Sequence, residues 1–375
     1  MTLDALRSLV LADEALQMDL ACIEESDAFV ARMVELAGPD LTALEIAAAI
    51  RGDPAGISRL AASAPNAAAW PSRHWLPVQA VGAAIDWAHF AGAPLAESFF
   101  TETARRAAAK PFNRLFRHVT RFSDFVENAE AEGSLVPDGF IFHMSRCGST
   151  LVAKMLAALP GVVMVSEAAP LDAVVRLGTP EPLKAMVAAL GRRRAGDETR
   201  YFVKLDFAHA LALPLFRAAF PATPWLFLYR DPVEVLVSQM RMRGTQTLAS
   251  PDLSPEETCA LALAEVCEAA IDEMEKGAGL AVNHADLPDA ISEILGHFGM
   301  ACGAAEHALM APASRRNAGS PATPFASDAE AKRKSATAAV RIAAETHLAG
   351  PYRRLEAFSR RRPAAPSASG RQPRR

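Results

Sequence analysis

One segment near the middle of the chain constrains the fold more than any other. An apolar run, Phe140-Ile141-Phe142, enters a short polar turn, and beyond the turn apolar residues recur at helical spacing from Leu151 to Leu159. Pro160-Gly161 then ends the helix. A strand, a tight turn and a helix bring unpaired backbone N–H groups and the positive helix end to one point. The segment therefore predicts a phosphate-binding loop in an α/β protein.

The turn differs from the loop of ordinary nucleoside-triphosphate enzymes, which reads G-x-x-x-x-G-K-[ST]. When the two are aligned on Gly148, only Gly148 and Thr150 match, and Ser149 stands where the lysine would be. The cation comes earlier, as Arg146. The alternative interpretation is an incidental strand–turn–helix that is capped by Ser149 and Thr150.

A second strand–helix junction follows further along the chain. Trp225 to Tyr229 is an apolar, aromatic-rich run that is typical of a buried parallel strand. It ends in Arg230-Asp231-Pro232, and a helix that carries Ser238 follows. The planar fork of an arginine can hold two phosphate oxygens at once. A strand end with a solvated Arg-Asp pair is the alternative.

Together the two motifs resemble those of the sulfotransferases. Arg146-Cys147-Gly148-Ser149-Thr150 is similar to their 5′-phosphosulfate loop, with the tyrosylprotein-sulfotransferase type most similar. Arg230 through Ser238 is similar to their R-D-P-x-x-x-x-x-S motif. The resemblance implies 3′-phosphoadenosine 5′-phosphosulfate as the donor, with Arg230 and Ser238 on its 3′-phosphate. A sulfuryl group carries less charge than a phosphoryl group, so no metal ion is expected. It covers residues 137–300 well and 301–358 weakly, and it does not extend to the first 130 residues.

The carboxyl ends of parallel strands gather the candidate catalytic residues. Ligands bind at this edge of an open sheet, so Arg146, Glu167, Lys204, Asp206 and Arg230 are expected in one crevice. Sulfuryl transfer needs a base for the acceptor hydroxyl and cations for the leaving phosphate. We predict Glu167 as the base, although a glutamate that caps the following helix is the alternative.

The resemblance supports these roles with departures. The tyrosylprotein type has its glutamate base at nearly the place of Glu167, with a slightly different spacing, and a lysine like Lys204 that faces the transferring group. Here Leu205 separates Lys204 from Asp206. The cytosolic small-molecule branch of the family has its histidine base near the place of Asp206. Asp206 is therefore the rival candidate for the base. The alternative is that Asp206 only forms a structural ion pair with a neighbour.

Apolar runs at 139–143, 162–165, 201–205, 225–229 and 280–283 alternate with helical segments near 150–159, 170–190, 208–220, 232–242 and 255–276. Such alternation predicts an α/β fold whose parallel sheet is covered on both faces, here a P-loop three-layer fold. We expect a leader-like helical extension over 1–62, an aromatic-rich accessory or cap region over 63–132, the sulfotransferase-like domain over 133–358 and a disordered basic tail over 359–375. Residues 303–327 are expected to form a loop, and 328–347 a helix.

Composition narrows the remaining choices. The net charge of −4 includes a tail from Ser359 with six arginines and no acid, so the rest of the chain is more acidic and a poor match for nucleic acid. The five scattered cysteines and the absence of a signal-like start predict a reducing, cytoplasmic location. The sequence contains no run of about twenty apolar residues, so no membrane span is expected. The late cluster Lys332-Arg333-Lys334 forms either a further 3′-phosphate contact or a solvated helix face.

Three functions are compatible with these motifs. The first is a sulfotransferase that acts on a hydroxyl-bearing small molecule or peptide. The second is a P-loop kinase in which Asp231 holds a metal, against which the missing loop lysine argues. The third is a nucleotide-binding module without turnover. The leader-like first segment could recruit a peptide partner.

Overall fold

The computed structural model describes residues 1–51, 70–95, 97–129, 133–241, 253–277, 279–314, 316–317, 320–324 and 328–360. The chain forms two compact units that interleave along the sequence. The first comprises Met1–Pro137, Pro160–Tyr201 and Ala218–Phe220, and the second comprises Asp138–Leu159, Phe202–Arg217 and Pro221–Arg375. Each unit is described by itself. Residues 361–375 of the predicted basic tail and 52–62 of the first predicted segment lie outside the described residues, whereas Ser359 and Arg360 end a helix.

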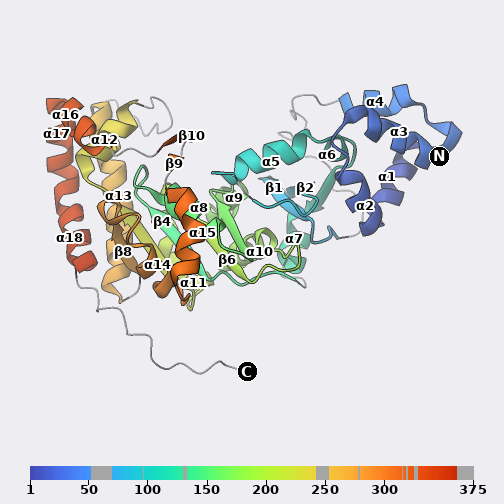
Figure 1. Ribbon diagram of the computed structural model, residues 1–375. Coiled ribbons are helices and arrows are strands. Elements are labelled where there is room, and N and C mark those ends of the chain that lie inside the picture. The colour runs from blue at the N-terminus through green and yellow to red at the C-terminus, as the bar shows by residue number, and fades with distance from the viewer. Residues whose placement is uncertain are drawn as a thin grey trace. The chain divides into compact units, whose positions relative to one another are not determined.

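The first unit begins with a group of helices, drawn in blue in Figure 1, as the apolar spacing of the segment predicts. Their apolar faces form a small core to which Leu6, Val10, Phe29, Met33 and Ile46 contribute. Thr2 and Asp13 cap the first two helices by accepting backbone N–H groups. The helices are α1 (Leu3–Leu11), α2 (Glu14–Ala21), α3 (Ser26–Ala37), the short 3₁₀ helix η1 (Gly38–Asp40) and α4 (Ala43–Arg51).

A three-stranded antiparallel sheet, which the sequence analysis did not foresee, underlies the aromatic-rich region (Figure 1). Its strands, in the order β1-β2-β3, are β1 (Trp75–Val81), β2 (Ala84–His89) and β3 (His118–Arg121). Trp75 and Trp87 are fully buried, so the aromatic residues of this region form a core. The helices α5 (Phe100–Ala109), α6 (Pro111–Leu115) and α7 (Phe122–Asn128) complete it.

The first unit also contains β5 (Val162–Ser166) and the two helices that follow it, α9 (Pro170–Val175) and α10 (Pro180–Leu190). The single helix expected over 170–190 is interrupted, because Gly178 adopts a left-handed φ of 70° and Pro180 starts a new helix. Both helices pack against β1.

A five-stranded sheet has the order β5-β6-β4-β7-β8. The remaining strands are β4 (Gly139–His143), β6 (Arg200–Lys204), β7 (Trp225–Tyr229) and β8 (Leu280–Asn283), so each of the five apolar runs is confirmed as a strand. The pairs β4–β6, β4–β7 and β7–β8 are all parallel. Every residue of β4 and β7 is buried, which matches a sheet that is covered on both faces.

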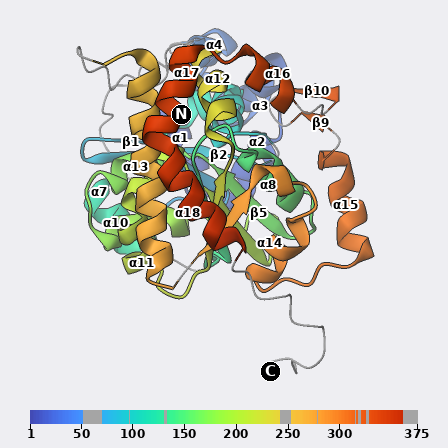
Figure 2. The same cartoon turned by 90° about the vertical axis from the view of Figure 1, so that its left-hand side faces the viewer.

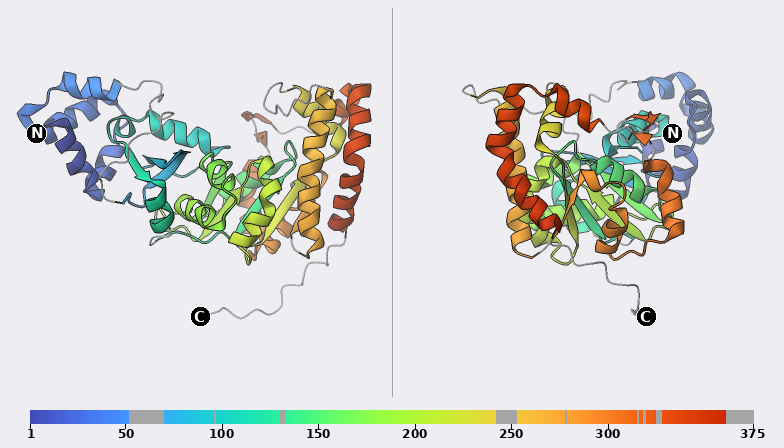
Figure 3. Two further views of the ribbon diagram at one scale, coloured as in Figure 1. Left: turned by 180° about the vertical axis from the view of Figure 1, so that it is seen from behind. Right: turned by 60° about the vertical axis from the view of Figure 1, so that its left-hand side comes forward.

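Helices of the second unit pack against the strands of that unit, for example the helix Ser149–Ala157 against β4 and the helix Ala349–Arg360 against β8. In Figure 2 and in both views of Figure 3, α13 and α18 lie side by side, and they also pack against each other by contact. The elements are α8 (Ser149–Ala157), η3 (Phe207–Ala212), α11 (Leu213–Ala219), α12 (Pro232–Arg241), α13 (Pro255–Glu275), η4 (His284–Asp286), α14 (Ile291–His297), α15 (Ala304–Ser314), α16 (Ala329–Ser335), α17 (Ala338–Ala343), the π-helical turn η5 (Ala344–Leu348) and α18 (Ala349–Arg360).

The loop expected over 303–327 is wrong in part, since α15 occupies Ala304–Ser314. Glu306 accepts the N–H of Gly303 at 2.8 Å and so caps the helix start, and Met310 is fully buried. The short strands β9 (Arg316–Asn317) and β10 (Ser320–Pro324) follow. Within the described ranges, no helix is both long and apolar enough to cross a bilayer.

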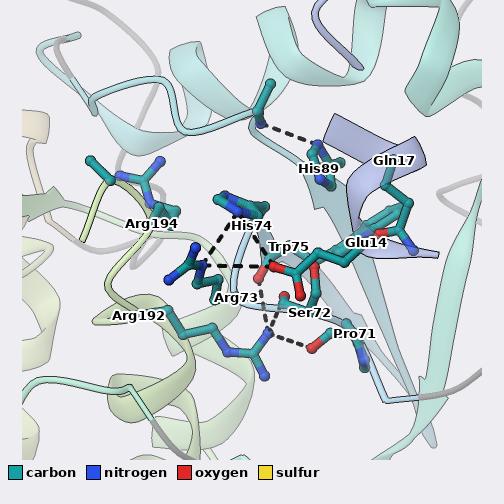
Figure 4. A network of polar contacts seen from close by, with 12 residues as sticks. Glu14, Gln17, Pro71, Ser72, Arg73, His74, Trp75, His89, Arg192 and Arg194 are labelled. Carbon is teal, nitrogen blue, oxygen red and sulfur yellow. Dashed lines mark hydrogen bonds and ion pairs between the residues drawn. The ribbon is translucent and has the colours of Figure 1, made fainter. Parts of the chain in front are cut away.

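Inside the first unit, the buried Arg192 holds the loop after α10 against the residues at the start of β1 (Figure 4). The NH1 group of Arg192 donates to the carbonyls of Pro71, Ser72 and Trp75 at 3.0–3.1 Å. Its guanidinium lies 4.8 Å from the ring centroid of Trp87. Burial lowers the pKa of Arg192 to about 10.

Candidate functional site

The turn after β4 has a backbone that is built to bind an anion. Ser145, Arg146 and Gly148 all have left-handed φ angles, of 69°, 50° and 88°. Alternation of left- and right-handed residues turns successive N–H groups toward one side and forms a concave anion site. Helix α8 starts directly behind it at Ser149, so its positive end adds to the same field.

His143 fixes the shape of this turn. Its Nδ1 accepts the N–H of Ser145 at 3.0 Å, which leaves the ring proton on Nε2, and Nε2 lies 2.9 Å from the carbonyl of Leu205, to which it donates. Gln239 adds a third tie, since its side-chain amide donates to the hydroxyl of Ser145 at 2.8 Å. His143 therefore positions the loop.

Gly148 is required by a close approach as well as by its backbone angle. A Cβ at this position would lie 2.9 Å from Cδ2 of His284 and 3.0 Å from Cδ1 of Leu287. His284 thus lies against the loop, although the sequence analysis did not consider it. Burial, together with the charges of Arg230 and Lys332, lowers the pKa of His284 to about 4, so this ring is neutral at pH 7.

The other predicted loop residues contribute in different ways. The Cys147 side chain is fully buried and donates from Sγ to the carbonyl of Leu228 at 3.1 Å. Burial raises the pKa of this thiol to about 12, so Cys147 offers a ligand only its backbone. Ser149 is buried and Thr150 half-buried at the first turn of α8.

The structure joins the two sequence motifs directly. Nε of Arg146 donates to the hydroxyl of Ser238 at 3.0 Å, across 92 residues of chain. Arg146 extends from the turn after β4, and Ser238 lies on α12, which follows β7. Because β4 and β7 are adjacent parallel strands, their carboxyl ends lie at the same edge of the sheet.

Arg230 is almost buried and is held by two carboxylates. Its Nε donates to Glu234 at 2.7 Å and its NH2 donates to Asp328 at 2.9 Å. Its side chain is 7% exposed. Asp231 accepts the N–H of Glu234 at 3.1 Å and so caps α12.

Two cations of the late basic cluster reach the same place. Lys332 lies 2.9 Å from the second oxygen of Asp328, and Arg333 lies 3.0 Å from Glu234. The side chain of Lys332 is 6% exposed, so it does not belong to a solvated helix face, whereas Lys334 pairs with Glu330 on the exposed side. Glu234 and Asp328 were not among the predicted site residues. The four-residue spacing from Arg230 to Glu234 on a helix was the available signal for the first of these.

The candidate acceptor-side residues lie on strand ends, as expected. Lys204 is the last residue of β6 and is completely buried. Asp206 follows two residues later and caps η3 by accepting the N–H of Ala208 at 2.9 Å. Glu167 follows β5 with a left-handed φ of 50°, in the first unit, whereas Lys204 and Asp206 belong to the second.

In the part of the chain that the structure describes, no three His, Cys, Asp or Glu side chains come together in a group that could hold a metal ion. The charged groups of this site in the second unit are therefore the cations Arg146, Arg230, Lys332 and Arg333 and the carboxylates Glu234 and Asp328. Cations and backbone N–H groups gather at the carboxyl ends of the strands in this α/β unit. A site of this kind suits a phosphorylated ligand.

No family model matches the chain, and no curated protein does either. Among solved structures, the sulfotransferase domain from the curacin biosynthetic pathway is 14% identical, with a TM-score of 0.40 over 60% of this chain and 98% of that one. The sulfotransferase domain of the Synechococcus PCC 7002 olefin synthase is 17% identical, with a TM-score of 0.39 over 61% and 96%. Sulfotransferase STF1 from Mycobacterium tuberculosis H37Rv is 13% identical, with a TM-score of 0.41 over 64% and 83%. Likeness at this level says nothing about activity, which has to follow from the residues of this chain.

Proposed function

We propose that the protein is a sulfotransferase that moves a sulfuryl group from 3′-phosphoadenosine 5′-phosphosulfate to a hydroxyl acceptor. The observation that supports this most is the hydrogen bond between Arg146 and Ser238. It joins an N–H-rich loop to α12, the helix that begins at Pro232, directly after Arg230-Asp231. Two anion-binding features on neighbouring strand ends suit a ligand with two separate phosphate groups.

The loop from Ser145 to Thr150 would bind the 5′-phosphosulfate. During transfer, the bond between sulfur and the bridging phosphate oxygen breaks, and negative charge grows on that oxygen. Backbone N–H groups, the start of α8 and the guanidinium of Arg146 would stabilise this charge. Arg230, Ser238 and Lys332 would bind the 3′-phosphate, which does not react.

The acceptor hydroxyl must lose its proton as the new oxygen–sulfur bond forms. Glu167 is our proposed base and Asp206 its rival, while Lys204 would face the transferring group. The left-handed backbone of Glu167 supports a functional role, since such strain is concentrated at functional sites. The acceptor is a small molecule or a peptide with a hydroxyl group.

Nucleotide binding tests the donor assignment directly. We expect adenosine 3′,5′-bisphosphate to bind the purified chain in calorimetry with a metal chelator present, and to bind more tightly than ATP. The reason is that the site offers two separate groups of cations and N–H donors. It lacks the loop lysine with which ATP-binding loops hold the triphosphate together with a metal ion. Loss of binding with chelator, or a preference for ATP with magnesium, would point to a phosphoryl-transferring kinase instead.

Replacing Arg230 tests the second phosphate contact. The 3′-phosphate takes no part in the chemistry, so Arg230→Ala should raise the donor KM and leave kcat nearly unchanged. The loss of a charged hydrogen bond predicts a cost of roughly 1.5–3 kcal/mol in donor binding. Arg353→Ala, which removes an exposed arginine from α18, is the matched control. A donor KM that is equal in both variants would contradict the assignment.

A further inference from the structure

The two carboxylates that hold Arg230 differ in their access to solvent. The side chain of Glu234 is 5% exposed and also pairs with Arg333, so it is a fixed partner inside the protein. The side chain of Asp328 is 53% exposed. Only the Asp328 carboxylate can therefore be replaced by an anion from solution without opening the core.

Asp328 also bridges two nearly buried cations. One of its oxygens lies 2.9 Å from NH2 of Arg230, and the other lies 2.9 Å from Nζ of Lys332. A buried cation is costly unless its charge is balanced, and Glu234 alone faces both Arg230 and Arg333, so Arg230 and Lys332 together favour a further anion whenever the protein is empty. A phosphate group also offers oxygens to two donors at once, and it carries more charge than a carboxylate.

We infer that Asp328 is a resident anion, which occupies the place of the 3′-phosphate in the empty protein and gives way to that phosphate on binding. This inference rests on the proposed function. The exchange keeps Arg230 and Lys332 in position before the donor arrives. It also lowers nucleotide affinity, because part of each phosphate contact replaces an existing ion pair, and it thereby speeds release of the spent donor.

The position of Asp328 in the chain suits this role. It stands at the start of α16, where its side chain accepts no backbone N–H group of that helix, so the helix does not depend on it as a cap. Helix α16 packs against α12, the helix that carries Ser238 and Glu234. Removal of the Asp328 carboxylate should therefore change the surroundings of Arg230 and Lys332 more than the fold.

Asp328→Asn tests the inference, and Glu330→Gln is its matched control, because Glu330 lies on the same helix and pairs with the exposed Lys334. The probes are inorganic phosphate, adenosine 3′,5′-bisphosphate and AMP, which lacks the 3′-phosphate. We expect Asp328→Asn to tighten binding of phosphate and of the bisphosphate by roughly 3- to 10-fold, mainly through slower dissociation. AMP affinity should stay within about two-fold, and Glu330→Gln should change none of the three.

The two probe types separate this inference from the proposed function. Inorganic phosphate can also bind the loop after β4, but that binding is common to the wild type and Asp328→Asn, so the difference between them reports on the exchange at Arg230 and Lys332. The bisphosphate, in contrast, requires both places. Weaker or unchanged phosphate binding in Asp328→Asn would overturn the inference. If that variant is unstable, Asp328→Ala must give the same gain. Tighter phosphate binding without any bisphosphate binding would support the resident anion and contradict the sulfotransferase assignment.

Discussion

Single residues with unusual backbones mark the strand ends of this protein. Ser145, Arg146 and Glu167 have left-handed φ angles without being glycine, and Ala91 is the fourth such residue among the described ones. Each such residue costs of order 1–3 kcal/mol, which the surrounding structure has to offset. At Ser145 the offset is visible, since His143 and Gln239 both bond to it. Strain at the predicted loop and at the predicted base supports a functional role for both.

At the scale of single residues, His284 predicts how the free energy of unfolding depends on pH. Its pKa in the folded protein is about 4, below its ordinary value of 6.5, so the unfolded chain takes up a proton more readily than the folded one. The free energy of unfolding should therefore fall as the pH drops from 6.5 toward 4, and this contribution should be constant above 6.5. His284 adds a slope of at most about 1.4 kcal/mol per pH unit in that window.

Two measurements check this prediction. NMR titration of the imidazole signals should give a midpoint near pH 4 for His284, and a midpoint near 6.5 would refute the burial argument. Denaturant unfolding at pH 5 and pH 7 should then show a smaller pH difference in His284→Gln than in the wild-type chain.

Some of these residues could be predicted from the sequence, and others could not. Arg146, Arg230 and Ser238 lie in local motifs whose residue types and spacing are visible in the chain. The hydrogen bond between Arg146 and Ser238 spans 92 residues, and that between Arg230 and Asp328 spans 98. Asp328 carries no local signal, because nothing in its neighbours indicates which distant cation it meets.

At the scale of secondary structure, the parallel strands were the most predictable elements. They are continuous apolar runs because both faces of the sheet are covered, and all five were found. The antiparallel strands β1 to β3 were missed because their aromatic residues were read as a general core. The turn at Gly82, with a φ of 56° between β1 and β2, was the missed hairpin signal. Helix α15 was missed because its alanines were grouped with a nearby Pro/Ser-rich stretch.

Arg192 provides a prediction at the same scale, since it fastens the connection after α10 to the segment before β1 (Figure 4). Arg192→Ala would remove a donor from three carbonyls, of which that of Ser72 keeps the N–H of Trp75, and it would remove a cation from the Trp87 ring. We expect the free energy of unfolding to fall by roughly 2–4 kcal/mol. Tryptophan fluorescence can follow this, because Trp70, Trp75 and Trp87 all belong to the same unit.

The neighbouring residue supplies the control for this variant. Arg193 is exposed, so Arg193→Ala should change the free energy of unfolding by no more than about 0.5 kcal/mol. Arg192→Lys keeps the charge but loses the planar fork and should fall between the two. Equal stability of the Arg192 and Arg193 alanine variants would show that the three carbonyl contacts contribute nothing.

At the scale of the whole molecule, the candidate bases belong to different units. The anion site, Lys204 and Asp206 belong to the second unit, and Glu167 belongs to the first. The division into four consecutive segments that composition suggests stays a prediction. The choice of base is thus also a choice of the unit that supplies it.

Paired substitutions decide between the two candidate bases. Glu167→Gln and Asp206→Asn each keep side-chain volume and polarity, so the fold and the binding of adenosine 3′,5′-bisphosphate should be retained. If Glu167 is the base, its variant should lose roughly 10²–10⁴-fold in kcat, the usual contribution of a positioned base, while Asp206→Asn stays near the wild-type value. Asp206 also caps η3, so the stability of Asp206→Asn must be measured as well. A fall in kcat without a fall in stability would come from the loss of a base and not from the loss of the helix cap. Collapse of kcat in Asp206→Asn alone, with the helix intact, would move the base to the end of β6 and into the unit that is proposed to bind the donor. Normal turnover in both variants would mean that the proton leaves through another group, although the donor site would keep its support from Arg146, Arg230 and Ser238.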